Sequence, residues 1–328
     1  MRIDQLAILF GIPDLADRLH AVEERIQPVL EDGGSDLGTP SWRVASAGGK
    51  RLRPLLTIAC AELGGVFDDR VIDGAAAIEL VQVGSLIHDD LFDVALSRRG
   101  APTINANEGR GHALLAGNWV LATASQLAIN VGASAASLIA ETVARLCVGQ
   151  VTEFEELFNV DRTVASHLDS IRGKTAALFE AACRMGSICA DLDPDQADTL
   201  GAFGDAFGMS FQVVDDLLDI VGDPAKLGKP IGVDLLAGVY TYPVLSTLGD
   251  ANGSHLRGIM GDPSALNVDE IVRMVTQSGG MDASRSLIAQ FDDAARQAAS
   301  HLPKSDISAG MQRFSSEYSR WALETLVA

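Results

Sequence analysis

The sequence predicts an all-α protein, and three observations support this fold class. Hydrophobic residues make up 47% of the 328-residue chain but aromatic residues only 5%, so the apolar content is mostly Ala, Leu, Val and Ile. Long stretches rich in Ala and Leu favour helix. Helical periodicity recurs along the chain, and no run alternates apolar and polar residues as a half-buried strand does.

The N-terminal third is expected to form helices separated by glycine- and proline-rich breaks. A first helix is expected at Leu15–Leu30, and the stretch EDGGSDLGTP ends it. The glycine-led basic turn GGKRLRP follows, and an apolar helix is expected at Leu55–Leu63. A long helix at Asp69–Ala95 carries an acidic cluster towards its C-terminal end, and LSRRGAPT forms the loop after it.

The rest of the chain continues the helical pattern. Four helices are expected at Gly111–Gly132, Ala135–Leu157, Val164–Ala190 and Pro194–Val221. A second acidic cluster, VVDDLLDIVGD, ends the last of these, and the glycine- and proline-rich GDPAKLGKPIGVDLLAG is a loop. The final helices are expected at Tyr242–Leu248, Val268–Ser278, Asp282–His301 and Ile307–Val327. No short-period repeat and no Ser/Gly linker divides the chain.

Charge and cysteine usage limit the partners and the compartment. The net charge of −19 disfavours nucleic acid and anionic membranes as general partners, so an anionic ligand would need local basic groups or metal ions. The N-terminus does not have the pattern of a signal peptide, and no uncharged apolar run is long enough to span a membrane. The cysteines show no metal-ligand spacing, which indicates small core residues in a reducing cytoplasm. They are Cys60, Cys147, Cys183 and Cys189.

Two acidic clusters share the spacing DDxxD. They are Asp89, Asp90 and Asp93, and Asp215, Asp216 and Asp219. On a helix, the first and last aspartates of a cluster share a face, and the middle one points about a third of a turn away. Such like charges repel, and their apolar flanks make burial costly, so a neutralising cation is expected. Oxygen-only ligands without EF-hand spacing favour Mg²⁺ shared with a phosphorylated substrate. A solvated acidic face is the alternative for either cluster alone.

Two basic groups accompany the acidic clusters. Lys50, Arg51 and Arg53 follow two glycines, which let the backbone approach an anion. Arg98 and Arg99 follow the first acidic cluster within one loop. One anion would be reached through metal and Arg98, and the other would be held directly by Lys50, Arg53 and Arg99. The combination indicates a reaction between two phosphorylated molecules, although either group alone could be a solvated loop.

These segments resemble the trans-isoprenyl diphosphate synthases, also called polyprenyl synthetases. The matching pieces occur in the family's order between Gly48 and Pro243: GGKRLRP, SLIHDDLFD with RRGAPT, KTAALF, FQVVDDLLD and GKPIGVDLLAGVYTYP. The resemblance implies one all-α domain over residues 1–328, with antiparallel helices around a deep central cavity, usually as a homodimer. It also implies a Mg²⁺-dependent enzyme that condenses an allylic diphosphate with isopentenyl diphosphate.

The resemblance further implies roles for individual residues. The two acidic clusters would face each other across the cavity mouth and hold three Mg²⁺ on the allylic diphosphate. The direct metal ligands would be Asp89, Asp93 and Asp215. Three more aspartates would either bind metal themselves or contact the residues that do: Asp90, Asp216 and Asp219. Arg98 would touch the allylic diphosphate. The remaining substrate-binding residues, mainly for isopentenyl diphosphate, would be Gly49, Lys50, Arg53, Gln82, Arg99 and Lys229. Above the reacting carbon would lie Lys174, Thr175 and Gln212.

Product length is expected to depend on the residues that precede Asp89. The growing tail would run beside this helix, past Ser85, Gly84 and Val81. Because Gly84 and Ser85 are small, no aromatic ring plugs the path there, which favours a product longer than C15, from C20 upwards. The alternative is that Gly84 only allows two helices to pack closely.

Some residues depart from the family pattern, and other functions stay open. Family members often have Glu-Gly-Lys where this chain has Ala237, Gly238 and Val239, and Asp where it has Asn118. Both changes remove charge near the expected site. The alternatives are a class I terpene cyclase of the same fold, a non-catalytic subunit of a heteromeric synthase, and a helical scaffold protein. The second DDxxD motif and the basic groups argue against the cyclase, and two intact acidic clusters argue against the non-catalytic subunit.

Overall fold

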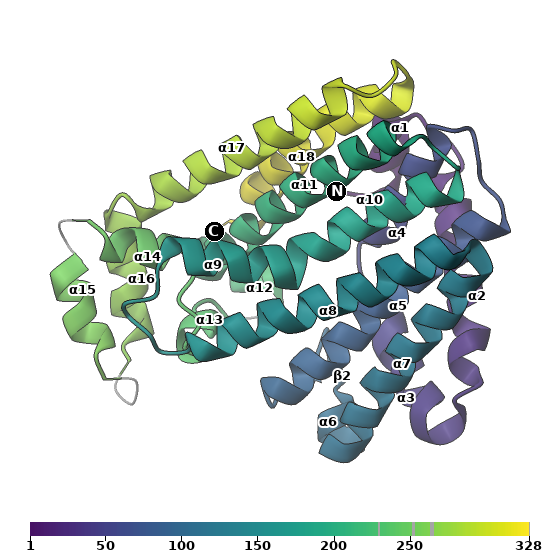
Figure 1. Cartoon of the computed structure of the whole chain (residues 1–328). Coiled ribbons are helices and arrows are strands. Elements are labelled where there is room, and N and C mark those ends of the chain that lie inside the picture. The colour runs from purple at the N-terminus through teal and green to yellow at the C-terminus, as the bar shows by residue number, and fades with distance from the viewer. Residues whose placement is uncertain (229, 251–252, 263–265, 328) are drawn as a thin grey trace.

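The computed structural model describes residues 1–228, 230–250, 253–262 and 266–327. Helices dominate the described chain (Figure 1), which confirms the predicted all-α class. The only strands among these residues are β1 (Ser97–Arg98) and β2 (Ala101–Pro102), a short antiparallel ribbon inside the predicted LSRRGAPT loop.

The helices follow one another with short connections. Those up to residue 131 are α1 (Ile3–Phe10), α2 (Leu15–Glu31), the π-helix η1 (Gly34–Gly38), α3 (Thr39–Ser46), α4 (Leu52–Glu62), α5 (Asp69–Phe92), α6 (Ile104–Asn107) and α7 (Arg110–Val131). Those from residue 133 to 227 are α8 (Ala133–Glu155), α9 (Val164–Ile171), the π-helix η2 (Arg172–Ala176), α10 (Ala177–Cys189), α11 (Pro194–Val221) and α12 (Pro224–Leu227). The last are α13 (Val233–Leu236), α14 (Tyr242–Leu248), α15 (Gly253–Met260), α16 (Val268–Gln277), α17 (Gly280–Ser300) and α18 (Asp306–Leu326).

The predicted helix positions are confirmed, and α11 and α14 match residue for residue. The start of α11 follows from its sequence, because the Asp193 carboxylate accepts the backbone N–H of Gln196 and Pro194 occupies the first turn. Asp68 caps α5 in the same way. The helices α1, α3, α6 and α15 were not predicted, and the segment GDPAKLGKPIGVDLLAG, predicted as a loop, contains the short helices α12 and α13. The stretch EDGGSDLGTP was predicted as a plain break, whereas the chain turns through η1 directly into α3.

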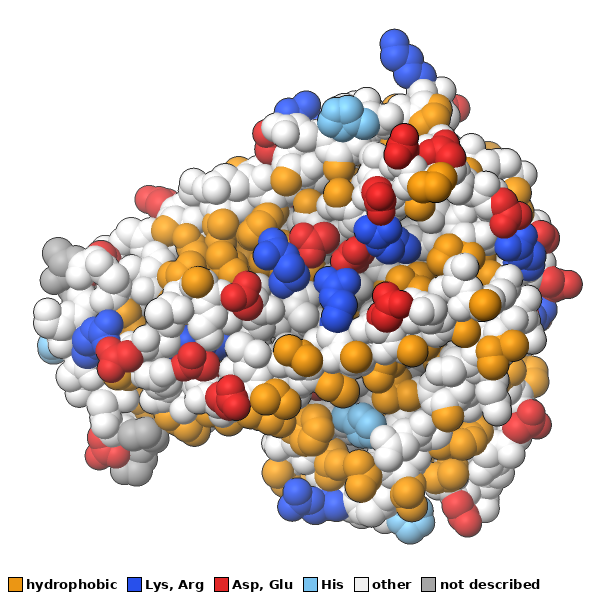
Figure 2. All heavy atoms as spheres, in the orientation of Figure 1, with side chains coloured by type: hydrophobic (Ala, Val, Ile, Leu, Met, Phe, Trp, Pro, Cys, Tyr) orange, Lys and Arg blue, Asp and Glu red, His pale blue; other side chains and the backbone are white. Residues whose placement is uncertain are grey.

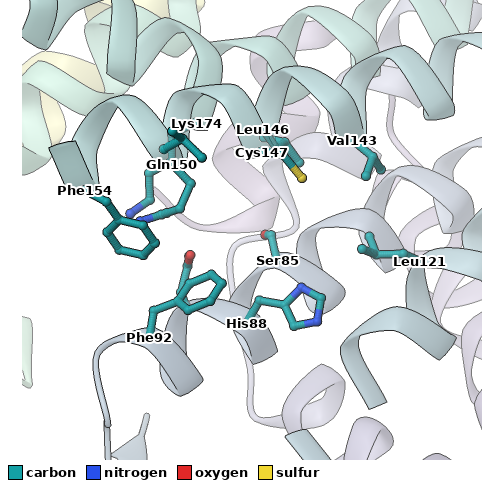
Figure 3. A pocket seen from close by; sticks show the side chains of 12 residues that line it. Ser85, His88, Phe92, Leu121, Val143, Leu146, Cys147, Gln150, Phe154 and Lys174 are labelled. Carbon is teal, nitrogen blue, oxygen red and sulfur yellow. The ribbon is translucent and has the colours of Figure 1, made fainter. Parts of the chain in front are cut away.

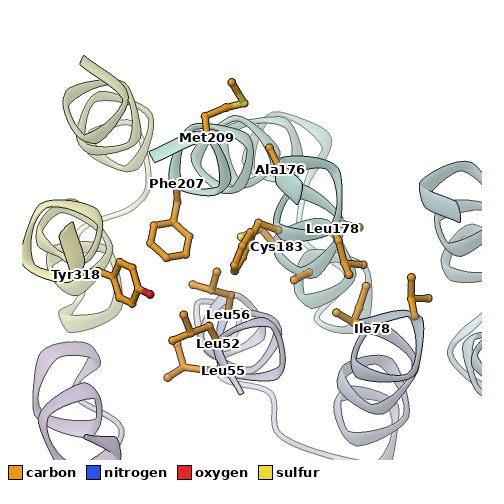
Figure 4. Packing of buried hydrophobic residues seen from close by; sticks show 14 of the residues in the cluster. Leu52, Leu55, Leu56, Ile78, Ala176, Leu178, Cys183, Phe207, Met209 and Tyr318 are labelled. Carbon is orange, nitrogen blue, oxygen red and sulfur yellow. The ribbon is translucent and has the colours of Figure 1, made fainter. Parts of the chain in front are cut away.

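The two helices that carry the acidic clusters lie on either side of α10. Helix α5 packs along α7 and also contacts α10, while α11 packs against α10 and α17. In Figure 4, leucines of α4 point towards Phe207 of α11 and Tyr318 of α18. Each such side chain, when fully buried, stabilises the fold by about 1.5–3 kcal/mol. This packing holds the acidic helix ends in fixed places.

Two helices in the described part of the chain are long and apolar enough to cross a membrane by length and composition. They are α5 and α7, and 72% and 44% of their most apolar windows are buried inside the fold. A core helix of a soluble protein passes the same test, so this is weak evidence for a membrane span. The expectation that the chain does not span a membrane stays a prediction.

The cysteine prediction is confirmed for three positions and wrong for one. Cys60, Cys183 and Cys189 are buried free thiols, as expected of small core residues. Cys147 is exposed instead, because it lines the open apolar cavity between α5 and α8 that is described below.

Candidate active site

A cavity of about 430 Å³ gathers most of the predicted cationic residues, and we call it the cationic cavity. The predicted binding residues on its wall are Gly49, Lys50, Arg53, Gln82 and Arg99. They come from the glycine-led turn, the start of α4, the middle of α5 and the β1–β2 turn. The sequence therefore predicted correctly that these distant segments meet.

Burial perturbs the cations of this cavity. It lowers the pKa of Lys50 to about 8 and that of Arg53 to about 10. Burial and the neighbouring charge of Arg98 lower the pKa of Arg99. The Arg53 guanidinium lies 4.2 Å from the centre of the Phe179 ring, and its Nε has no hydrogen-bond partner among the described residues. Several cations lie close together in this cavity, with fewer anions beside them. The cavity therefore favours an anionic ligand.

Arg51 is part of the same turn but supports the fold instead. It adopts a left-handed backbone conformation with φ 48°, immediately before α4. Its guanidinium donates to Glu79 Oε1 at 2.7 Å, to Glu23 Oε1 at 2.9 Å and to the Ala45 carbonyl at 2.7 Å. These contacts fix the turn while its neighbours face the cavity. The sequence analysis gave Lys50 and Arg53 to an anion but left Arg51 without a role, and these contacts supply one.

The aspartates of the first cluster divide into two orientations. Asp89 lines a second cavity described below, and Asp93 is exposed at the end of α5. Asp90 is only 2% exposed, and its Oδ1 accepts a hydrogen bond of 2.8 Å from Arg98 Nε. The middle aspartate thus points away from its neighbours, as the helical spacing predicted. Burial raises the pKa of all three carboxyl groups, that of Asp89 to about 6.

The second cluster differs from the first, because its last aspartate is buried as well as its middle one. Asp215 is partly exposed, and its charge acts on Lys50 and Tyr318 at the cationic cavity. Asp216 is 1% exposed and pairs with His167 and Gln212. Asp219 is equally buried and accepts the backbone N–H groups of residues 233 and 234, at the start of α13. Among the six predicted metal ligands, the inward-facing Asp90, Asp216 and Asp219 are therefore better suited to support the ligands than to bind metal.

Lys174 and Thr175 sit on the π-helical turn η2, which interrupts the helix predicted at Val164–Ala190. Such turns redirect side chains and often occur at functional sites. Gly149 of α8 lies against this turn, and a Cβ there would come within 2.4 Å of the Lys174 backbone nitrogen. The Lys174 Nζ donates to Glu153 Oε1 at 2.8 Å. Burial lowers the pKa of Lys174, but the charges of Asp89 and Glu153 raise it, and the net shift is upward. The side chain therefore stays a charged ammonium beside the first acidic cluster.

A chain of hydrogen bonds joins the predicted catalytic oxygens to the second cluster. Thr175 Oγ1 donates to Gln212 Oε1 at 2.7 Å, and Gln212 Nε2 donates to Asp216 Oδ1 at 3.0 Å. His167 Nε2 lies 2.8 Å from Asp216 Oδ2 and is 1% exposed. Because the Gln212 amide nitrogen donates its hydrogen bond to Asp216, the amide oxygen must face Thr175. The sequence analysis did not identify His167 or Glu153, because no local motif marks either residue.

A second cavity, of about 280 Å³, has mostly apolar walls, and we call it the apolar cavity. Figure 3 shows Ser85, His88 and Phe92 of α5 facing residues of α8, with Leu121 of α7 at one end and Lys174 at the other. The wall contributed by α8 consists of Val143, Leu146, Cys147, Gln150, Val151 and Phe154. Because Asp89 also lies on the wall, a molecule bound at the acidic cluster could place an apolar tail here.

Only one of the three residues predicted to line the tail path lies on this cavity. Ser85 is on its wall, whereas Val81 is fully buried. Gly84 faces α7, where an added Cβ would lie 2.9 Å from the Leu121 side chain and 3.3 Å from the Gly117 carbonyl oxygen. The alternative interpretation of Gly84 as a close-packing residue is therefore the right one, and the expectation that it lines the path is wrong.

The predicted site residues are thus gathered around one end of α5, with two qualifications. Lys229 lies outside the described residues. Arg98 is paired with Asp90 and lines a small cleft beside Arg43 and Thr103, next to the main cavities. Within the ranges that the structure covers, no three Asp, Glu, His or Cys side chains converge as a ready-made metal site.

Comparisons with known proteins agree with this geometry. The family model described as polyprenyl synthetase matches residues 35–277. Heptaprenyl diphosphate synthase component 2 of Geobacillus stearothermophilus is 32% identical over 89% of this chain and 92% of its own length. A crystal structure of a decaprenyl diphosphate synthase from Rhodobacter capsulatus has a TM-score of 0.87 and 31% identity, over 97% of this chain and 99% of that chain. A polyprenyl synthase from Caulobacter crescentus, complexed with calcium and isoprenyl diphosphate, has a TM-score of 0.85 and 28% identity, over 97% of both chains.

Proposed function

Because the chain belongs to the polyprenyl synthetase family, we propose that it condenses an allylic diphosphate with isopentenyl diphosphate, head to tail and in trans, to give a product of C20 or longer. One observation carries this proposal. A cationic cavity and an apolar cavity both border α5, and Asp89 and Lys174 lie on the wall of the apolar one. This arrangement fits one diphosphate without a metal, a second diphosphate at the acidic cluster, and a long apolar tail.

Mg²⁺ fits the oxygen-only donor set at the two helix ends, and we propose that Asp89, Asp93 and Asp215 hold three ions together with the allylic diphosphate. The raised pKa of Asp89 indicates a carboxylate whose charge lacks full compensation in the metal-free protein. Bound there, Mg²⁺ would neutralise the diphosphate so that it can leave. The similar polyprenyl synthase from Caulobacter crescentus is complexed with calcium and isoprenyl diphosphate, which supports the binding of a divalent cation by this chain.

The chain's own residues position the two substrates and exclude water from the reacting carbon. Lys50, Arg53 and Arg99 hold isopentenyl diphosphate, so that its double bond reaches the allylic carbon. Lys174 donates hydrogen bonds to the departing diphosphate. The oxygens of Thr175 and Gln212 stabilise the allylic cation, because their orientation is fixed before it forms. The apolar walls exclude water, which would otherwise quench the cation, and the proton lost after condensation goes to the released diphosphate.

The test of this function is incubation of the purified full chain with Mg²⁺, isopentenyl diphosphate and each allylic primer, followed by sizing of the products. We expect linear trans prenyl diphosphates of C20 or longer. A cyclic hydrocarbon formed from one primer without isopentenyl diphosphate would identify a terpene cyclase. No turnover with any primer would favour a non-catalytic subunit.

The proton competes with Mg²⁺ at Asp89. This carboxyl group has a pKa of about 6 without metal, so it is mostly neutral at pH 5 and mostly ionised at pH 7. Only the ionised form binds Mg²⁺. The Mg²⁺ concentration that gives half-maximal rate should therefore rise by up to about tenfold from pH 7 to pH 5, for one displaced proton. Steady-state rates at several Mg²⁺ concentrations and pH values measure this, and a constant requirement across this range would contradict it.

We propose that the chain forms a homodimer through the outer faces of α7 and α8. Large apolar side chains that do not line the apolar cavity are exposed on these helices: Leu114, Leu115, Ile129 and Val148. Figure 2 shows hydrophobic side chains gathered over this face. An apolar surface of this extent is rare on a monomer and fits a second copy of the same helices.

Substitution within this surface should dissociate the dimer. Leu115 is 59% and Val148 66% exposed, so Leu115→Asp with Val148→Asp leaves the monomer's core unchanged. Light scattering should give a dimer mass for the wild type and a monomer mass for the double variant. Ile8→Asp, at an 82% exposed position on α1, is the matched control and should stay dimeric. A monomeric wild type would contradict the homodimer and favour a separate partner subunit, as the name of the Geobacillus relative suggests for that protein.

We also propose that residues 1–328 act as one synthase domain in the cytoplasm. The buried free thiols of Cys60 and Cys183 support a reducing compartment. Expression of a fluorescent fusion followed by cell fractionation tests the location.

A further inference from the structure

The C-terminal helix α18 reaches the cationic cavity and contacts Lys50. The Lys50 Nζ lies 4.1 Å from the centre of the Trp321 ring and 5.0 Å from the centre of the Tyr318 ring. It also donates to Tyr318 Oη at 3.3 Å. Lys50 and the two aromatic residues are far apart in the sequence, so the sequence analysis did not connect them.

The aromatic pair is anchored to the core. Tyr318 is 4% exposed, and its ring stacks on Phe211 of α11 with 5.5 Å between centres and 25° between planes. The Trp321 ring lies 5.8 Å from that of Tyr318. Phe211 and Tyr318 also line the cationic cavity. Tyr318 therefore lies on the cavity wall with Trp321 packed beside it, and we call these two residues the aromatic platform.

Lys50 needs such support because its own segment does not fix it. The residue follows Gly48 and Gly49, which have positive φ angles of 93° and 145°. Its long, flexible side chain loses rotamer entropy when it is held in one place. The charge of Asp215 attracts Lys50, but the positive charge of Arg99 within the same cavity repels it. An attraction between the ammonium and two ring faces opposes both the entropy loss and the repulsion.

We propose that Trp321 and Tyr318 position the Lys50 ammonium for the diphosphate of isopentenyl diphosphate, and that Trp321 is a positioning residue for this substrate alone. This inference rests on the proposed function, because it assigns isopentenyl diphosphate to the cationic cavity. Apart from the N–H group that it donates to Tyr318 Oη, the ammonium keeps its donors free for the diphosphate, since the ring faces accept no hydrogen bond in the way that a carboxylate would. A preorganised cation binds its ligand with a smaller entropy cost.

The test compares the Michaelis constants of the two substrates in the full-length Trp321→Leu variant. The KM for isopentenyl diphosphate should rise by about three- to tenfold, as expected for one cation–π contact, while the KM for the allylic diphosphate stays unchanged. Trp321→Phe keeps a ring face and should recover most of the loss. In a Lys50→Met background, Trp321→Leu should have no further effect on this KM.

Several outcomes would overturn the inference. They are an unchanged KM for isopentenyl diphosphate, an equal rise for both substrates, or a Phe variant no better than Leu. A wild type that incorporates no isopentenyl diphosphate would instead contradict the proposed function, which is a different result.

A binding measurement keeps the inference testable even if the Leu variant does not fold. The chain has three tryptophans, so Trp42→Phe with Trp119→Phe leaves Trp321 as the only one. Inorganic pyrophosphate, added with a chelator to exclude metals, should change the Trp321 fluorescence. The same addition to this variant with Lys50→Met should have a much smaller effect. An equal change in Trp321 fluorescence with and without Lys50 would contradict the proposed role of the aromatic platform.

Discussion

Replacement of Asp89 by asparagine should lower kcat by about a thousandfold, or about 4 kcal/mol of transition-state stabilisation. The asparagine has nearly the same shape but no charge, so it cannot hold Mg²⁺ as the carboxylate does. Asp89 lies on the wall of the apolar cavity, and Lys174 remains beside it. The variant would therefore keep an ammonium that can bind diphosphate but lose the metal that activates the leaving group. Steady-state kinetics at saturating substrates and Mg²⁺ measures the effect.

A matched control separates charge loss from helix damage. Asp69→Asn removes a carboxylate from the first turn of the same helix, where its side chain is 86% exposed and pairs only with Arg25 at the surface. Such exposed pairs contribute little to stability, so this variant should keep nearly normal rates. Circular dichroism should show the same helical signal for both variants. A rate for Asp89→Asn within tenfold of the wild type would contradict the assigned role.

Ser85→Phe should shorten the product to C15 or less while turnover continues. Ser85 lies on the wall of the apolar cavity, between α5 and α8, four residues before Asp89. A phenyl ring there would fill much of the roughly 280 Å³ cavity and block a tail after one or two additions. The acidic and cationic groups stay in place, so the first condensation should still occur. Chromatographic sizing of the products measures the change.

Two other variants distinguish blockage from general disturbance. Ser85→Ala removes only the hydroxyl group, which donates to the Gln82 carbonyl, and should leave the product distribution unchanged. Gly84→Ala places a methyl group 2.9 Å from the Leu121 side chain, so it should lower stability before it affects product length. The same products from Ser85→Phe and the wild type would remove Ser85 from the tail path.

The sequence was most informative where local chemistry decides the structure. The start of α11 could be predicted because Asp193 and Pro194 favour a helix start whatever surrounds them. Helical geometry alone predicted that the Asp90 side chain points away from that of Asp89. In the structure Asp90 is buried and Asp89 is not. The η2 turn was not predictable in this way. It depends on the approach of Gly149 to the chain at Lys174, from a different helix.

Contacts between distant segments account for what the sequence did not reveal. His167 reaches Asp216 from α9, and Trp321 reaches Lys50 from the last helix. Nothing within a few residues of either one indicates a role. The misassignment of Gly84 has the same cause, because its neighbour Leu121 belongs to α7. The resemblance to a family identified the reacting groups, while the tertiary structure showed which residues hold them.

The most direct test is diffraction from crystals grown with Mg²⁺ and an allylic thiodiphosphate that does not react. The account predicts metal density between the diphosphate and the carboxylates of Asp89, Asp93 and Asp215, with the prenyl tail in the apolar cavity beside Ser85. A diphosphate bound elsewhere, with Asp89 and Asp215 in solvent and without metal, would contradict it.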